Sequence, residues 1–188
     1  MPGDLRLTAA DAIYNLRSAL DQAVCRCAVL AGTSPKETYF PHGSDLAGFE
    51  ESIRTKCKKI SGAVRDAIAA LEPYHGGNGY LFRVLHDLNL VDKHTDLLAI
   101  GLAIPRAEMR QGKGLIPSGE IWRRTEDSFE PLPAGTINEV DHQFKVTIAV
   151  TFLGVEAVEG QSASRILAQL RDHAIQAVDV IEEAAGIA

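Results

Sequence analysis

Between residues 81 and 96 the sequence LFRVLHDLNLVDKHTD places apolar residues at helical spacing and then interrupts them with charge. At about 100° of rotation per residue, one face of this helix carries four apolar side chains: Leu81, Val84, Leu85 and Leu88. Asp92 continues that face, and a second row along its edge holds His86, Asn89 and Lys93. A buried carboxylate is costly unless it is paired or hydrogen-bonded. The segment therefore predicts either a structural polar network or a binding site.

Helical periodicity recurs in four further segments. A long amphipathic helix is expected over about residues 5–31, a short one capped by Ser44 or Asp45 up to Lys56, a third over 61–71, and a last one starting at Ser162 or Ser164 and ending near 185. The positions expected to face inward are Ile13, Leu16, Leu20, Ala23, Val24 and Cys27; Val64, Ala67, Ile68 and Leu71; and Ile166, Leu167, Leu170, Ala174, Ala177 and Ile181.

Between residues 96 and 153 the pattern changes to that of strands. Residues 97–104 form a continuous apolar run ending at Pro105, residues 119–124 suggest a second strand, and residues 143–152 alternate between apolar and polar. The expected fold is α+β: one domain over residues 1–188, mainly a helical bundle from residues 5–95 and 160–186. A small antiparallel sheet at about 96–153 is inserted before the C-terminal helix.

Composition narrows the class of protein. The 188 residues carry a net charge of −6 and 46% hydrophobic residues, which predicts a packed core and no broad basic surface for nucleic acid. The basic run at residues 56–59 is interpreted as a solvated face. Three cysteines argue against a disulfide framework. No signal peptide or membrane-length apolar run is present, so we expect a cytoplasmic protein without membrane association.

Two charged clusters are candidates for chemistry. Arg17 and Asp21 lie one turn apart on the first helix, either as a surface ion pair or as an edge that faces the helix of Asp92. Lys93 and His94 suit a helix C-terminus electrostatically, whereas a carboxylate there does not. Asp92 therefore needs a partner, for which Arg17, Lys93 or a backbone amide are the candidates.

The remaining motifs do not predict a bound cofactor. His75, His86, His94 and Asp92 suggest a metal site, but their spacing lacks the compact i, i+4 pair of known zinc motifs, so no metal is expected. The glycine-rich segment 76–79 precedes a helix without a strand before it, which indicates a flexible turn rather than a dinucleotide site.

Two segments resemble a family. Residues 15–22, NLRSALDQ, resemble the LRSALDH signature of a group of uncharacterised bacterial proteins, and residues 85–94, LHDLNLVDKH, resemble their second signature, which ends in Asp-Lys-His. Phe40–Pro41 and the loop 72–74 match as well. The first signature also looks like the Arg-x4-6-His motif of the HEPN superfamily, helical bundles that include many metal-independent ribonucleases.

The resemblance implies roles for particular residues. Arg17 would steady a scissile phosphate, and the motif's histidine corresponds to Gln22, which cannot shuttle a proton near neutral pH. His94 would replace that histidine if it lies beside Arg17. The expected catalytic residues are thus Arg17 and His94, and the expected ligand-binding residues are Asp21, Gln22, His86, Asn89, Asp92 and Lys93.

Two functional interpretations stay open. The first is a HEPN-like protein with a polar site between helices for RNA or a nucleotide. The second is a non-catalytic module that dimerises or binds a protein, with its polar cluster serving as architecture. A homodimer is expected in part because Tyr14 and Ala28 lie outside the main apolar stripe of the first helix.

Overall fold

A computed structural model describes residues 3–94, 100–110, 122–124, 129–131, 143–152 and 155–187, with side chains for 5, 7–90, 150–152 and 155–187. The described elements are α1 (Gly3–Leu30), α2 (Leu46–Lys56), α3 (Gly62–Ala70), α4 (Tyr80–His94), β1 (Ile100–Arg110), β2 (Trp122–Arg124), β3 (Phe129–Pro131), β4 (Gln143–Phe152), the 3-10 helix η1 (Glu156–Val158) and α5 (Ala163–Ala184).

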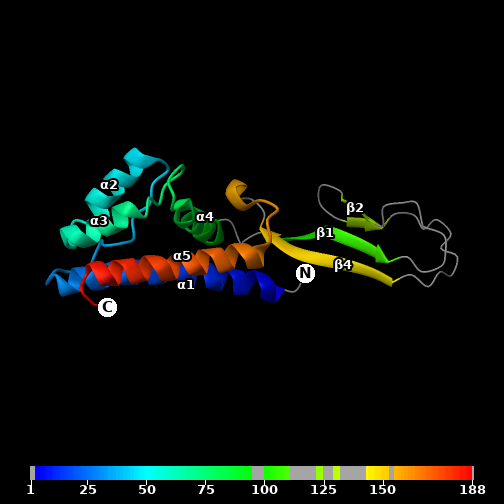
Figure 1. Ribbon diagram of the computed structural model, residues 1–188, viewed down its shortest axis with the longest axis horizontal. Coiled ribbons are helices and arrows are strands. Elements are labelled where there is room, and N and C mark those ends of the chain that lie inside the picture. Colours follow the sequence, from blue (N-terminus) through cyan, green and yellow to red (C-terminus); the bar gives the residue numbers. More distant parts are fainter. Residues whose placement is uncertain are drawn as a thin grey trace. The chain divides into compact units, whose positions relative to one another are not determined.

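The chain is mostly helical, and its helices form a bundle, as the periodicity predicts. α1 and α5, the first and last helices, run side by side, α4 contacts both of them, and α3 contacts α5 (Figure 1). This arrangement lets the apolar stripes of α1, α4 and α5 share one core. Within the described residues, no helix combines the length and low polarity needed to cross a bilayer.

The core confirms most of the inward positions expected from the sequence. Its fully buried side chains include Ile13, Leu20, Val24, Val64, Ile68, Leu85, Leu88, Leu170 and Ile181. Leu16, Leu71, Leu81 and Leu167 are only partly buried and pack against this core. Burying one such side chain contributes roughly 1.5–3 kcal/mol, so the shared core is the main source of stability. Ala28 belongs to this core at 0% exposure, so its expected role in a dimer surface is wrong.

The loop before α2 is held in place by contacts of Asp45 and Gly43. Asp45, one of the two expected caps, accepts a hydrogen bond from the Gly48 amide at 2.7 Å and so begins α2. Gly43 forms a parallel bridge with Tyr74, and a Cβ atom there would lie 2.3 Å from the Phe49 nitrogen. Glycine is therefore required at position 43, and the segment 38–43 is fixed between α1 and the loop before α4.

The strands form two pairs. β1 pairs with β4, and β2 pairs antiparallel with β3 in a register that places Trp122 opposite Pro131. The chain forms two compact units, one made of residues 1–103 and 150–188 and the other of residues 104–149. The second unit falls within the segment expected to be a β insertion.

Two details of the strand prediction are wrong. β1 continues through Pro105 to Arg110, because a two-stranded pair leaves one edge of each strand without a partner and tolerates a missing N–H there. The alternation places Thr151 on a polar face, yet Thr151 is 3% exposed because the chain returns and bridges it at Ser162. Residues 97–99 of the predicted strand lie outside the described residues.

Candidate functional site

A polar pocket lies between α1 and α4 within the first unit. Its volume is about 300 Å³, and it is lined by Tyr14, Arg17, Ser18 and Asp21 of α1 and by His86, Asn89 and Leu90 of α4. On both helices these positions follow the i, i+3, i+4 spacing that places side chains on one face. The two charged or polar rows singled out in the sequence, one on each helix, therefore meet at one place.

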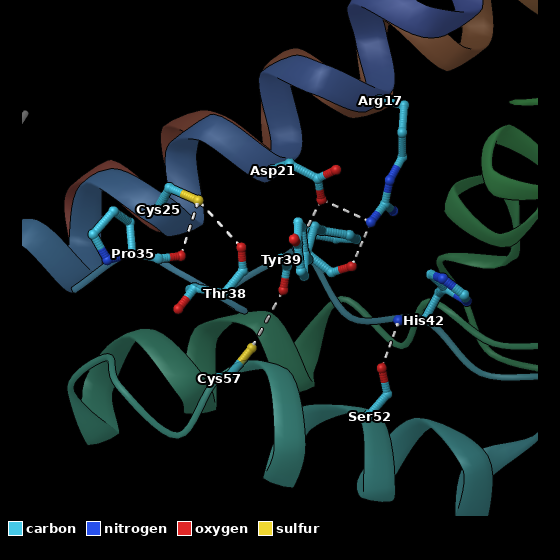
Figure 2. Close-up of polar contacts among 10 residues, drawn as sticks. Arg17, Asp21, Cys25, Pro35, Thr38, Tyr39, His42, Ser52 and Cys57 are labelled. Carbon is cyan, nitrogen blue, oxygen red and sulfur yellow. Dashed lines mark hydrogen bonds and ion pairs between the residues drawn. The ribbon is translucent and has the colours of Figure 1, made fainter. Parts of the chain in front are cut away.

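Arg17 joins α1 to the loop that precedes α2. Its Nη2 donates to Asp21 Oδ1 at 2.7 Å (Figure 2). The same nitrogen donates to the Phe40 carbonyl at 2.7 Å, and the Phe40 amide donates back to Asp21 Oδ1 at 2.9 Å. The guanidinium carbon also lies 5.8 Å from the centre of the Phe40 ring. Because Arg17 is only 7% exposed, the alternative of a surface ion pair is wrong.

The charge of this network is largely balanced. Burial lowers the pKa of Arg17, and the neighbouring Asp21 carboxylate opposes that shift by its charge and its hydrogen bond. An arginine stays protonated in proteins, so the pocket wall holds a close cation–anion pair. The pair presents little net charge to a molecule in the pocket.

Two buried polar atoms of the pocket residues have no hydrogen-bond partner in the described part of the chain. They are Arg17 Nη1, a donor, and Asn89 Oδ1, an acceptor on a side chain that is 5% exposed. An unsatisfied buried polar group typically costs about 1–3 kcal/mol. A donor and an acceptor are thus both left unmatched at the same pocket.

His86, which lines the pocket, stacks on a second histidine that lies outside the lining. The ring of His42, from the loop before α2, lies 3.5 Å from the ring of His86, measured between centres, with 26° between the planes. Burial lowers the pKa of His42 to about 3, and nearby positive charges, first that of His86 and then that of Arg17, act in the same direction. His42 is therefore neutral at pH 7. Its backbone amide donates to Ser52 Oγ at 3.4 Å (Figure 2).

The cysteines near this loop are structural. The Cys25 thiol donates to the Thr38 carbonyl at 3.1 Å, and the Cys57 thiol lies 3.9 Å from the Tyr39 carbonyl (Figure 2). Burial raises the pKa of Cys57 to about 12, and it also raises the pKa of Cys25. A thiol that stays protonated is a poor nucleophile and a poor metal ligand.

The structure does not gather every expected site residue. Gln22 is exposed, and its amide donates to Ser18 Oγ at 3.1 Å instead of lining the pocket. Asp92, Lys93 and His94 belong to the backbone of α4, but their side chains lie outside the described residues, so their roles stay predictions. Among the described side chains, no group of three His, Cys, Asp or Glu is arranged to hold a metal ion.

Sequence reasoning missed several residues at this site. Tyr14 and Ser18 lie on the same α1 row as Arg17, and Leu90 lies one turn after His86, so helical spacing alone was enough to find them. His42 had no such signal, because its stacking on His86 joins residues 44 positions apart.

Comparisons with known proteins found no matching protein-family model, curated protein or solved structure.

Proposed function

We propose that this protein is a HEPN-like helical bundle whose pocket between α1 and α4 binds a nucleotide or a single-stranded RNA segment without cleaving it. The observation that carries the proposal is the unmatched buried donor and acceptor, Arg17 Nη1 and Asn89 Oδ1, on residues of one pocket. The two segments that resemble known signatures, 15–22 and 85–94, lie in the two helices that line it.

The size and walls of the pocket suit one nucleotide. A volume of about 300 Å³ lies at the small end of ligand sites in proteins, which begin near ~300 Å³. Tyr14 lines the pocket and is 53% exposed, and aromatic side chains of this kind are the usual platform for bases of single-stranded nucleic acid. With a net charge of −6, the chain has no general attraction for phosphates, so binding has to come from the pocket itself.

Binding without cleavage follows from the proton chemistry. Metal-free RNA cleavage needs groups that remove and deliver protons at the reacting atoms. The resemblance assigns that role to position 22, where Gln22 has no titratable group and lies outside the pocket. Of the described residues that line the pocket, His86 is the only imidazole, and it stacks on the partly buried ring of His42.

Binding is tested by titrating the full chain with a fluorescein-labelled oligouridylate and an oligoadenylate and following anisotropy. We expect saturable binding that weakens on Arg17→Lys, because lysine keeps the charge but replaces the planar guanidinium, which carries Nη1 and Nη2 at separate fixed positions, by a single nitrogen. The matched control is Arg165→Ala, an exposed arginine on α5 that does not line this pocket. Absence of binding to either oligonucleotide would overturn the proposal.

Cleavage is tested separately by incubating the same oligonucleotides with wild type and Gln22→His in the presence of a chelator. The proposal expects wild type to leave the RNA intact, and a gain of cleavage in Gln22→His would support the HEPN-like assignment of position 22. RNA cleavage by wild type that Arg17→Lys removes would overturn the non-catalytic part of the proposal.

A second candidate function is a dimerising or protein-binding module. The observation that favours it is a set of exposed large apolar side chains on α1: Leu5, Leu7, Tyr14, Val29 and Leu30. A second hollow of about 570 Å³, lined by Ala12, Asn15, Leu16, Ser164, Leu167, Ala168 and Arg171, lies between α1 and α5. Light scattering at micromolar concentration decides whether the chain pairs; a monomer at all concentrations would count against this candidate.

A further inference from the structure

The hydrogen-bonding groups of the pocket between α1 and α4 indicate which part of a nucleotide enters it. Resting on the proposed function, we infer that this pocket takes the hydrogen-bonding edge of a nucleobase and leaves the phosphate outside.

The donor side of the pocket is poorly suited to a phosphate. Arg17 Nη2 is already engaged by Asp21 Oδ1 and the Phe40 carbonyl, both at 2.7 Å, whereas the buried Nη1 has no partner in the described part of the chain. The Asp21 carboxylate that touches the same guanidinium would repel a dianion. A single neutral acceptor, such as a carbonyl or ring nitrogen of a base, satisfies Nη1 without that repulsion.

The acceptor side excludes a phosphate more strongly. Asn89 Oδ1 is buried and has no partner in the described part of the chain, so it needs a ligand atom that donates a hydrogen. A phosphate at neutral pH offers mainly acceptors. The edge of a nucleobase places an N–H donor beside an acceptor, and asparagine is a side chain that commonly reads such an edge.

The remaining walls suit a flat ring. Tyr14 and Leu90 contribute aromatic and aliphatic surface, and His86 contributes a ring held in place by its stack on His42. Because Arg17 Nη1 and Asn89 Oδ1 are both shielded from solvent, a base reaches each atom only when its side chain rotates toward the pocket. The bound base then matches two groups that stay unmatched without it.

The inference is tested by calorimetric titration of the full chain with uridine, adenosine, guanosine and cytidine, with the 5′-monophosphate of each, and with inorganic phosphate. We expect at least one nucleoside to bind, its own 5′-monophosphate to bind with similar affinity, and inorganic phosphate neither to bind nor to compete. Asn89→Leu keeps the approximate shape but removes the acceptor, and should weaken nucleoside binding roughly 10-fold or more.

The matched control is Asn15→Leu, which changes an exposed asparagine of α1 outside this pocket and should leave nucleoside binding unchanged. Thermal melts check that Asn89→Leu folds; the replacement removes an Oδ1 atom that has no hydrogen-bond partner in the described part of the chain.

The outcomes separate this inference from the proposed function. Competition by inorganic phosphate against the nucleotide, or unchanged nucleoside binding by Asn89→Leu, would overturn the base-edge assignment while the pocket remains a nucleotide site. Failure of every nucleoside, nucleotide and oligonucleotide to bind wild type would overturn both.

Discussion

α1 packs against two neighbours in different ways. Toward α5 it contributes Ala12 and Leu16, which share an apolar hollow with Leu167 and Ala168, and an exposed ion pair from Arg26 to Glu182 at 3.0 Å. Toward α4 it contributes a row that is largely polar, with buried Arg17 at its centre. One helix thus combines an ordinary apolar interface with a polar one.

The difference shows which interface the fold depends on. Apolar burial is non-directional, so the α1–α5 contact is favourable without any specific hydrogen-bond partner. The α1–α4 pocket leaves a donor and an acceptor unmatched, which lowers stability; on the proposed function, a bound ligand would supply the missing partners. Changes to the first interface should therefore alter stability, and changes to the second should alter binding.

The largest expected effect on the free energy of unfolding comes from a change in the apolar core of α5. Leu170 of α5 is 1% exposed, so Leu170→Ala should lower the free energy of unfolding by about 2–5 kcal/mol through lost burial and a cavity. Oligonucleotide affinity of the folded fraction should not change. Denaturant melts and anisotropy measured on the same preparation check both statements; a stable variant with weakened binding would contradict the comparison.

Replacing Arg17, at the centre of the polar α1–α4 interface, should have a smaller effect on stability. Arg17→Ala leaves Asp21 and the Phe40 carbonyl without their donor, and we expect a loss of about 1–3 kcal/mol, since the Asp21 side chain is 27% exposed and can be hydrated. Unlike Leu170→Ala, this variant should also lose ligand binding. Arg165→Ala, the surface control, should change the free energy of unfolding by no more than about 0.5 kcal/mol.

Acid should weaken the histidine stack next to the pocket. The pKa of His42 is about 3 in the folded state, below its ordinary value of 6.5, so the unfolded chain binds more protons between these values. Stability is therefore full above pH 6.5 and falls on acidification, by ~2 kcal/mol near pH 5 if only His42 is considered. His42→Phe keeps an aromatic ring and should remove this part of the pH dependence in denaturant melts; an unchanged profile would show that another group titrates.

Asn89→Leu should have the smallest effect on stability, and it therefore distinguishes the α1–α4 interface from the α1–α5 interface most clearly. Asn89→Leu should leave the free energy of unfolding within about 1 kcal/mol of wild type, because the amide oxygen that it removes has no partner. The same variant should lose nucleoside binding. A large loss of stability in thermal melts would mean that Asn89 is part of the architecture.

Helical periodicity predicted the bundle because burial repeats every turn along α1, α3, α4 and α5. The same spacing placed Arg17 and Asp21 on one helix edge and His86 and Asn89 on another, and α1–α4 packing brings those edges together. Local pattern therefore predicted the part of the site that lies on helix faces.

The loop between α1 and α2 could not be predicted in this way. The hydrogen bonds of Phe40 to Arg17 and Asp21, and the ring contact between His42 and His86, depend on tertiary structure, since no periodic signal links an irregular segment to a helix residue 19 or more positions away. Gln22 was expected at the site from the resemblance alone: it is adjacent to Asp21 in sequence, but the helix turns it about 100° away from the pocket row.

Phe40 is bonded to α1 through both of its backbone polar groups, its carbonyl by Arg17 and its amide by Asp21. Its amide proton can exchange with solvent deuterium only when this contact opens. A ligand that holds Arg17 in place should slow that exchange, whereas one that draws the guanidinium toward itself should speed it. The exchange rate of this one amide thus reports, without an attached probe or a substitution, whether a ligand in the pocket strengthens the contact between this loop and α1 or competes with it.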